Sequence, residues 1–242
     1  MTTLDNKLKA VKALAFDVGG TVVDWHTGIS RQLAAFGREK GIEADWVALT
    51  KAWRTHGLAG AINKSRKELP RGNIDGAHRQ ALDRILSEAG IEGITTQDRD
   101  EMTLFWHRLD AWPDAANAHA RLKKSFTMTT LTILSVSLII DISRRAPFQW
   151  DAVISCEFLD HYKLHPSVYQ SGVRLLQLEP HEVMMVAAHN LDLRAAHEQG
   201  LRTAFIRRPV EWGEGTTPEQ ELDSTIDIVA NDMEDLADQL GA

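Results

Sequence analysis

Short apolar runs alternate with amphipathic segments along much of the chain. Residues 11–16 form an apolar run about as long as a buried strand of a parallel sheet, and the run ends at Asp17. Similar runs predict strands at residues 126–134, 152–155, 183–188, 203–206 and 226–229. The segments that follow them predict helices at residues 138–145, 166–178, 191–199 and 233–240. Strands that alternate with helices indicate an α/β fold with a doubly wound parallel sheet.

A long helical block separates the first strand from the rest of this sheet. Residues 27–110 carry helix patterns almost throughout, with Gly41 placed to end one helix and Asp45 placed to cap the next. Trp112, followed by a proline, marks the end of the block. The pattern predicts a Rossmann-like core domain of residues 1–26 and 113–242, with an inserted helical cap domain of residues 27–112.

Composition limits the classes of function. The 242 residues are 43% hydrophobic and 25% charged, as in soluble globular proteins, and the net charge of −7 comes without a dense basic cluster. The single cysteine, Cys156, excludes an internal disulfide. The longest apolar stretch, residues 131–142, is shorter than the roughly 20 residues of a membrane span, and the N-terminus lacks the apolar region of a secretory signal. We therefore expect a cytoplasmic protein with no nucleic-acid and no membrane partner.

Polar side chains stand where the predicted strands end. Asp17 is followed by Gly19, Gly20 and Thr21, which predict a turn with a hydroxyl group on it. Ligands of open α/β sheets bind just outside the carboxyl ends of the strands, where a carboxylate is well placed as a nucleophile. The alternative is that Asp17 only caps the turn. Further polar residues at or near later strand ends are Ser135, Lys163, His189, Asn190 and Asp192.

The polar groups at the strand ends follow one another along the chain as a carboxylate, a hydroxyl, an ammonium group and a second acid. This order resembles the four motifs of the haloacid dehalogenase superfamily. The resemblance covers nearly the whole chain, because the helical insert falls where that superfamily places its first type of cap. Residues 16–25, Trp53-Arg54, 150–155 and 163–169 look like the type II L-2-haloacid dehalogenase branch. Residues 187–192, Ala-Ala-His-Asn-Leu-Asp, are similar to a subgroup in which some members also act on fluorinated acids.

The resemblance implies hydrolysis of short 2-haloacids to 2-hydroxy acids, with no metal and no other cofactor. Asp17 would attack C2 of the substrate, and water would then cleave the resulting aspartyl ester. The resemblance also implies a role for each residue. Thr21 and Ser135 would orient the nucleophile or hold the substrate carboxylate, and Lys163 would keep Asp17 ionised. Arg54 would receive the halide or clamp the carboxylate, and Asp192 with His189 or Asn190 would position and activate water. Gly19 and Tyr169 complete the expected substrate-binding set, with simple packing as the alternative for Tyr169.

The residue two places after Asp17 separates two classes of activity. Phosphatases of the superfamily carry a second aspartate there to protonate the leaving alkoxide, whereas this chain has Gly19 and a halide needs no proton. A Mg²⁺-dependent phosphatase or phosphonate hydrolase stays open, because Asp192 could ligate Mg²⁺ together with Asp17. A non-catalytic binder of small carboxylates also stays open, because the branch usually has an aromatic residue in place of Gly19 and an asparagine in place of Val136. A homodimer is left open as well.

Overall fold

A parallel sheet forms the centre of the protein. The computed structural model describes residues 8–216 and 222–242, and in these ranges six parallel strands form one sheet in the order β3-β2-β1-β4-β5-β6. The strands are β1 (Ala13–Phe16), β2 (Thr127–Thr132), β3 (Ala152–Ser155), β4 (Val183–Ala187), β5 (Arg202–Ile206) and β6 (Ile228–Ala230). The predicted doubly wound α/β fold is confirmed.

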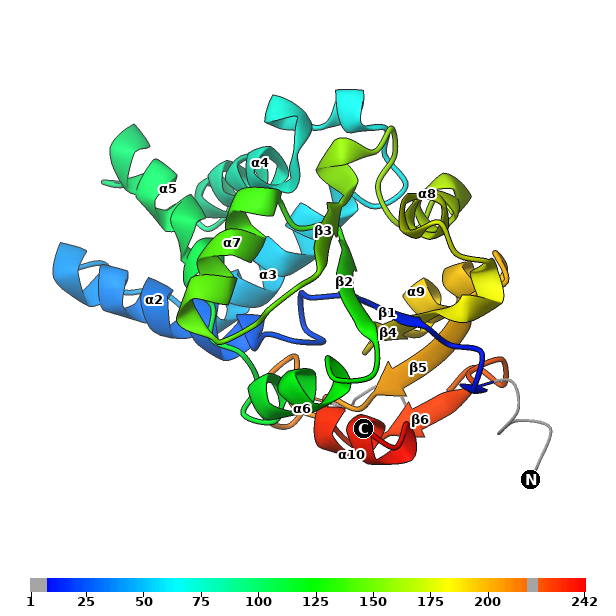
Figure 1. Cartoon of the computed structure of the whole chain (residues 1–242). Coiled ribbons are helices and arrows are strands. Elements are labelled where there is room, and N and C mark those ends of the chain that lie inside the picture. The colour runs from blue at the N-terminus through cyan, green and yellow to red at the C-terminus, as the bar shows by residue number, and fades with distance from the viewer. Residues whose placement is uncertain (1–7, 217–221) are drawn as a thin grey trace.

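The helices outside the helical insert cover both faces of the sheet. They are α6 (Ala115–Leu122), α7 (Val136–Arg145), α8 (Pro166–Leu176), α9 (Asn190–His197) and α10 (Met233–Gln239), with short 3₁₀ turns at Cys156–Phe158 and Pro180–Glu182. Helices α8 and α9 lie on one face, and α6, α7 and α10 lie on the other (Figure 1). In the described part of the chain, no helix has both the length and the apolar character needed to span a membrane.

Strand β1 lies at the point where the strand order reverses. Its Phe16 aligns with Thr130 of β2 on one side and with Val186 of β4 on the other. The backbone N–H of Asp17 continues this ladder, because it donates to the carbonyl of Val186 at 3.0 Å. The crevice beyond such a reversal is the usual ligand site of an open α/β sheet. The chain therefore delivers Asp17 and the residues after β4 to the same place.

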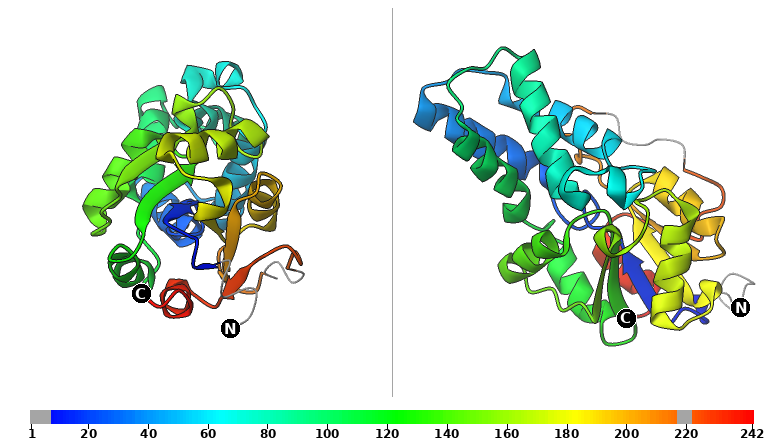
Figure 2. Two further views of the ribbon diagram at one scale, coloured as in Figure 1. Left: turned by 45° about the vertical axis from the view of Figure 1, so that its right-hand side comes forward. Right: turned by 90° about the horizontal axis from the view of Figure 1, so that it is seen from above.

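The block between β1 and β2 is helical, as its pattern predicts. It contains α2 (Trp25–Lys40), α3 (Trp46–Ala59), α4 (Ile74–Glu88) and α5 (Thr96–Thr103), with 3₁₀ turns at Arg66–Glu68, Pro70–Gly72 and Leu104–Arg108. Gly41 ends α2 in the left-handed conformation at φ 67°, and Asp45 caps α3 by accepting from the N–H of Ala48. These helices gather beside the sheet (Figure 2). The division into domains at residues 27 and 112 stays a prediction.

Three details differ from the predicted elements. Helix α6 was not predicted, because its short, alanine-rich sequence shows little helical period beyond the buried face of Ala115, Ala118 and Leu122. The helix patterns extend to residue 110, whereas α5 ends at Thr103 and the chain continues as a 3₁₀ turn over Leu104–Arg108. The strand predicted at residues 126–134 ends at Thr132, because the N–H of Leu134 turns back to the hydroxyl of Thr132 at 3.2 Å.

One loop of the helical block is hydrogen-bonded to the loop before α8. The N–H of Asn63 donates to the carbonyl of Lys163 at 2.7 Å, and the N–H of Tyr162 donates to the carbonyl of Lys64 at 2.9 Å. The side-chain oxygen of Asn63 also accepts from the N–H of Leu164 at 3.1 Å. These bonds fix the backbone of Lys163 against the helical block.

Candidate active site

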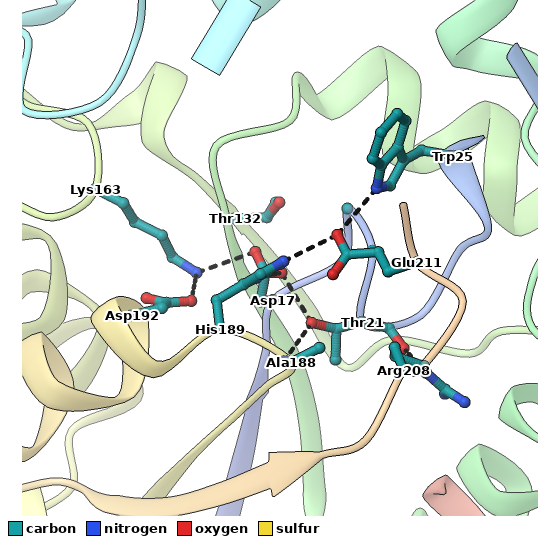
Figure 3. A network of polar contacts seen from close by, with 12 residues as sticks. Asp17, Thr21, Trp25, Thr132, Lys163, Ala188, His189, Asp192, Arg208 and Glu211 are labelled. Carbon is teal, nitrogen blue, oxygen red and sulfur yellow. Dashed lines mark hydrogen bonds and ion pairs between the residues drawn. The ribbon is translucent and has the colours of Figure 1, made fainter. Parts of the chain in front are cut away.

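The carboxylate of Asp17 is buried where β1 ends, and Thr21 holds it. The hydroxyl of Thr21 donates to Asp17 Oδ2 at 2.9 Å, and it accepts from the N–H of Ala188 at 2.9 Å (Figure 3). Because Ala188 follows β4, the hydroxyl joins the loop after β1 to the loop after β4. The turn also depends on Gly20, which has φ +96°, a conformation that side-chain-bearing residues rarely adopt.

A buried ammonium group lies beside two carboxylates. Lys163 Nζ is 3.3 Å from Asp17 Oδ1 and 2.6 Å from Asp192 Oδ2 (Figure 3). The phenol of Tyr169 donates to Asp192 Oδ1 at 2.7 Å. All four side chains are buried, so the charges interact with little screening by water.

This arrangement keeps Asp17 ionised. Burial alone would raise the pKa of Asp17, but the charge of Lys163, the charge and hydrogen bond of His189 and the hydroxyl of Thr21 hold it well below its usual value. Burial likewise opposes charge on Lys163, yet the two carboxylates raise the pKa of this lysine. Burial raises the pKa of Asp192, and the charge of Asp17 adds to that shift, whereas Lys163 and Tyr169 oppose it. Of the two carboxylates, Asp17 is therefore the one whose surroundings favour the ionised form.

His189 links Asp17 to a second buried carboxylate, Glu211. His189 Nδ1 is 3.3 Å from Asp17 Oδ2, and His189 Nε2 is 3.0 Å from Glu211 Oε1. The same Oε1 accepts from the indole N–H of Trp25 at 2.9 Å (Figure 3). Trp25 is the first residue of α2, so Glu211 connects the site to the helical block.

Electrostatics favour charge on both members of this pair. Burial would lower the pKa of His189, but Glu211 and Asp17 raise it well above its usual value. Burial would raise the pKa of Glu211, but the charge and hydrogen bond of His189, the charge of Arg54 and the N–H of Trp25 lower it. The surroundings of His189 thus favour its imidazolium form.

Arg54 of α3 brings a second cation to the site. Its guanidinium is buried, donates from Nη2 to the carbonyl of Gly19 at 3.0 Å, and lies with Cζ 5.3 Å from the ring centre of Trp25. Among the described residues, Nε and Nη1 have no hydrogen-bond partner. Buried donors of this kind are costly to leave unsatisfied, so they favour an anionic ligand.

These groups surround a cavity of about 190 Å³. Its polar lining comes from Asp17, Gly19, Arg54, Lys163, His189 and Asp192. Its apolar lining comes from Leu58, Ile62, Ile133, Leu164 and Leu191. A volume of this order suits a molecule of a few heavy atoms that carries both an anionic and an apolar part.

Four of the predicted site residues are not among the described residues that line this cavity, namely Thr21, Ser135, Asn190 and Tyr169. Thr21 instead contacts Asp17 through its hydroxyl. The hydroxyl of Ser135 caps α7 by accepting from the N–H of Leu138 at 3.3 Å. The amide oxygen of Asn190 accepts from the N–H of Asp223 at 3.5 Å. Tyr169 reaches the site only through its hydrogen bond to Asp192. The structure thus gives Ser135 and Asn190 contacts within the protein, and their contacts with a ligand stay predictions.

The donor set does not fit a divalent metal ion. Mg²⁺ is usually held by one or two carboxylates together with water molecules and substrate phosphates, so its site needs free space beside the carboxylates. Here the ammonium of Lys163 lies beside both Asp17 and Asp192, and the described residues contain no group of three or more His, Cys, Asp or Glu side chains that could hold a metal.

The sequence analysis did not identify Glu211 as a site residue. Glu211 lies five places after the end of β5, in a loop without a recognisable motif. The one available signal was that β5 is another parallel strand, whose carboxyl end opens onto the same edge of the sheet.

Several known proteins resemble this chain in sequence or in structure. Residues 11–200 match the family model described as haloacid dehalogenase-like hydrolase. The structure resembles that of the L-2-haloacid dehalogenase PA0810, with 36% identity, 95% of this chain and 99% of that chain covered, and a TM-score of 0.87. It also resembles the structure of the defluorinating L-2-haloacid dehalogenase Rha0230, with 37% identity, 96% of each chain covered and the same TM-score of 0.87. The (S)-2-haloacid dehalogenase 4A of Burkholderia cepacia is 26% identical over 220 residues, which are 88% of each sequence.

Proposed function

This chain belongs to the haloacid dehalogenase-like hydrolases, and from that membership we propose that it hydrolyses short 2-haloacids to 2-hydroxy acids. The observation that carries the proposal is the buried carboxylate of Asp17 beside the ammonium of Lys163, in a small cavity that also contains the guanidinium of Arg54. Two cations suit a substrate with one carboxylate and a leaving halide. The substrate carboxylate is an anion, and the halogen becomes one when it leaves, so both suit a cavity with two cations.

The first step forms an ester. One oxygen of Asp17 attacks C2 of the haloacid, and the halogen leaves as halide with the electrons of the carbon–halogen bond. The unpartnered N–H groups of Arg54 suit the departing halide or the substrate carboxylate. The absence of an acid at Gly19 is no obstacle, because a halide is a stable anion.

The second step cleaves the ester. Water attacks Cγ of Asp17, the bond from Cγ to the alkyl oxygen breaks, and the 2-hydroxy acid leaves with a proton. Thr21 suits a positioning role here, because its hydroxyl is held by the N–H of Ala188 and points at Asp17. Lys163 stays beside Asp17 and stabilises the carboxylate that re-forms.

The Mg²⁺-dependent alternative is less well supported. A phosphatase or phosphonate hydrolase needs the cation between Asp17 and Asp192, where the structure has the ammonium of Lys163. The non-catalytic alternative is decided only by an assay. A homodimer and a cytoplasmic location stay predictions from the sequence.

The test is halide release from L-2-chloropropionate, with fluoroacetate in parallel and EDTA in excess. Wild type should release halide, and Asp17→Asn should release none. Asp238→Asn is a matched control, because this carboxylate lies on α10 with 70% of its side chain exposed. Release that needs added Mg²⁺, or equal release by Asp17→Asn, would contradict the proposal. No release from either acid would favour the non-catalytic alternative.

A further inference from the structure

We propose that Glu211 is a positioning residue that makes His189 the base for hydrolysis of the aspartyl ester. This inference rests on the proposed function, since it concerns the second step of that reaction. The geometry behind it is the chain of contacts from Trp25 to Glu211, from Glu211 to His189, and from His189 to Asp17.

Glu211 decides which nitrogen of His189 exchanges a proton. An ionised carboxylate can only accept hydrogen bonds, so the nitrogen 3.0 Å from Glu211 Oε1, which is Nε2, carries a proton. The other nitrogen, Nδ1, faces Asp17 Oδ2 at 3.3 Å. Nδ1 is therefore the position that gains and loses a proton beside the reacting carboxyl group.

Formation of the ester itself would prepare His189 to act as a base. In the free enzyme, the negative charges of Asp17 and Glu211 face the imidazolium, while the cations Lys163 and Arg54 lie around the same cavity. Esterification removes the charge of Asp17, so the imidazolium releases its Nδ1 proton to solvent more readily. Glu211 keeps the Nε2 proton in place, and Nδ1 becomes free to accept a proton from water.

During hydrolysis, His189 transfers a proton from the attacking water to the leaving alkoxide. Nδ1 of His189 takes a proton from the water molecule while the water oxygen bonds to Cγ of Asp17. The tetrahedral intermediate collapses and breaks the bond from Cγ to the alkyl oxygen. The alkoxide takes the proton from Nδ1 and leaves as the 2-hydroxy acid. The carboxyl group of Asp17 then gives its proton to Nδ1, which restores the carboxylate and the imidazolium of the free enzyme.

Asp192 is less suited to this task. Its Oδ2 accepts from Lys163 at 2.6 Å, and its Oδ1 accepts from the hydroxyl of Tyr169 at 2.7 Å. Both oxygens are thus engaged with buried donors, and the adjacent ammonium opposes protonation. We assign Asp192 to holding Lys163.

Two neighbouring residues accommodate the carboxylate of Glu211, one by leaving space for it and the other by donating a hydrogen bond. At Gly20, a Cβ would stand 2.1 Å from Glu211 Oε1, so no side chain is compatible with the observed position of this carboxylate. The indole N–H of Trp25 supplies Oε1 with a second donor at 2.9 Å. Glu211 itself is only 6% exposed. A buried carboxylate with such specific accommodation is poorly explained as a solvated surface charge.

The experiment compares the two chemical steps in wild type and Glu211→Gln. Rapid-quench measurements follow halide release during the first turnover, and intact-protein mass spectrometry follows the ester on Asp17. Glutamine keeps the shape of the side chain and removes its charge. We expect a halide burst close to that of wild type, accumulation of the ester, and ester hydrolysis slowed by about 100-fold. The exposed Glu198→Gln on the carboxyl end of α9 is the matched control.

Two further readouts separate positioning from a structural role. The acid limb of ester hydrolysis should move to lower pH in Glu211→Gln, because loss of the negative charge lowers the pKa of His189. In addition, Glu211→Gln should have little further effect in a His189→Asn background, because Glu211 acts through His189.

The outcomes distinguish this inference from the proposed function. No halide from wild type would overturn the proposed function. A wild-type burst with unchanged ester hydrolysis in Glu211→Gln would overturn only the role of Glu211. Equal loss of burst and hydrolysis, or full additivity with His189→Asn, would also overturn that role, because Glu211 would then support the site as a whole.

Discussion

The ammonium of Lys163 lies 2.6 Å from the carboxylate of Asp192, closer than to the carboxylate on which it is proposed to act. Asp192 thus anchors the lysine, and the charge of the lysine reaches Asp17 over 3.3 Å. Tyr169 and the backbone bond from Asn63 complete the support of this pair. The ionisation of Asp17 therefore depends on a cation that is itself held by an acid from another strand end.

Removal of this cation should make the first step sensitive to acid. Lys163→Met keeps much of the side-chain volume and removes the charge that holds the pKa of Asp17 low, while the burial that raises this pKa persists. A protonated Asp17 cannot attack carbon. The acid limb of kcat/KM should therefore move to higher pH by about 1–3 units.

The measurement is the pH dependence of halide release in Lys163→Met, wild type and the exposed Lys124→Met as control. An acid limb that stays at its wild-type position in Lys163→Met would show that another group keeps Asp17 ionised.

Arg54 should govern binding of the anionic parts of the reaction. Its Nε and Nη1 lack partners among the described residues, so a bound anion would satisfy buried donors. Arg54→Met should lower kcat/KM by about 100-fold, and Arg54→Lys should lower it less, because lysine keeps the charge and loses the planar fork of donors.

Inhibition by added chloride identifies which anion Arg54 binds. If the guanidinium binds the halide, Arg54→Met should lose inhibition by chloride that wild type shows. If chloride inhibits both proteins equally while kcat/KM falls, the substrate carboxylate is the partner. An unchanged kcat/KM in Arg54→Met would contradict both roles.

The ester mechanism makes a prediction about oxygen atoms. In a single turnover with enzyme in excess and water labelled with heavy oxygen, the label should enter the carboxyl group of Asp17, because water attacks Cγ and the alkyl oxygen comes from the enzyme. Mass spectrometry of the peptide that contains Asp17, and of the product, measures this directly. Label in the first product, with none on Asp17, would show that water attacks the substrate carbon itself.

Local patterns predicted the sheet and the residues at its strand ends. Strand β1, which ends just before Asp17, is apolar and buried throughout, and the polar residues of the site follow β1 and β4 within a few positions. Parallel strands bring such ends together whatever the loops do, so Thr21 and His189 reach the same site. This part of the site follows from topology alone.

The remaining contacts depend on side-chain directions and on loops. Ser135 also follows a strand, yet its hydroxyl turns to the start of α7. Glu211 reaches His189 only because the loop after β5 folds back onto Gly20. Neither the direction of a hydroxyl nor the path of a long loop leaves a periodic signal in the sequence.

A bidentate ion pair should stabilise the sheet away from the cavity. Arg208 Nη1 and Nη2 donate to the two carboxylate oxygens of Asp114 at 2.8 and 2.9 Å, and Arg208 Nε donates to the carbonyl of Thr21 at 2.9 Å. Asp114 Oδ2 also accepts from the N–H of Met233 at 2.8 Å. The side chains of Arg208 and Asp114 are 6% and 15% exposed. The pair thus joins the loops after β1 and β5 to the starts of α6 and α10.

Replacement of the carboxylate should lower stability, and this loss should depend on pH. Burial would raise the pKa of Asp114, but the hydrogen bonds of Arg208 and Met233 hold it below the ordinary value of 3.8. Asp114→Asn should lower the free energy of unfolding by about 2 kcal/mol at neutral pH. A carboxyl group with a lowered pKa stabilises the fold above its unfolded-state pKa and loses this contribution as the pH falls through its folded-state pKa. The difference in urea-unfolding free energy between wild type and variant should therefore shrink below pH 3.8.

The control is Asp110→Asn, a substitution at a half-exposed position that breaks surface ion pairs with Arg31 and Arg145. It should lower the free energy of unfolding by less than about 1 kcal/mol. Equal losses at the two positions would mean that Asp114 contributes no more than a surface ion pair.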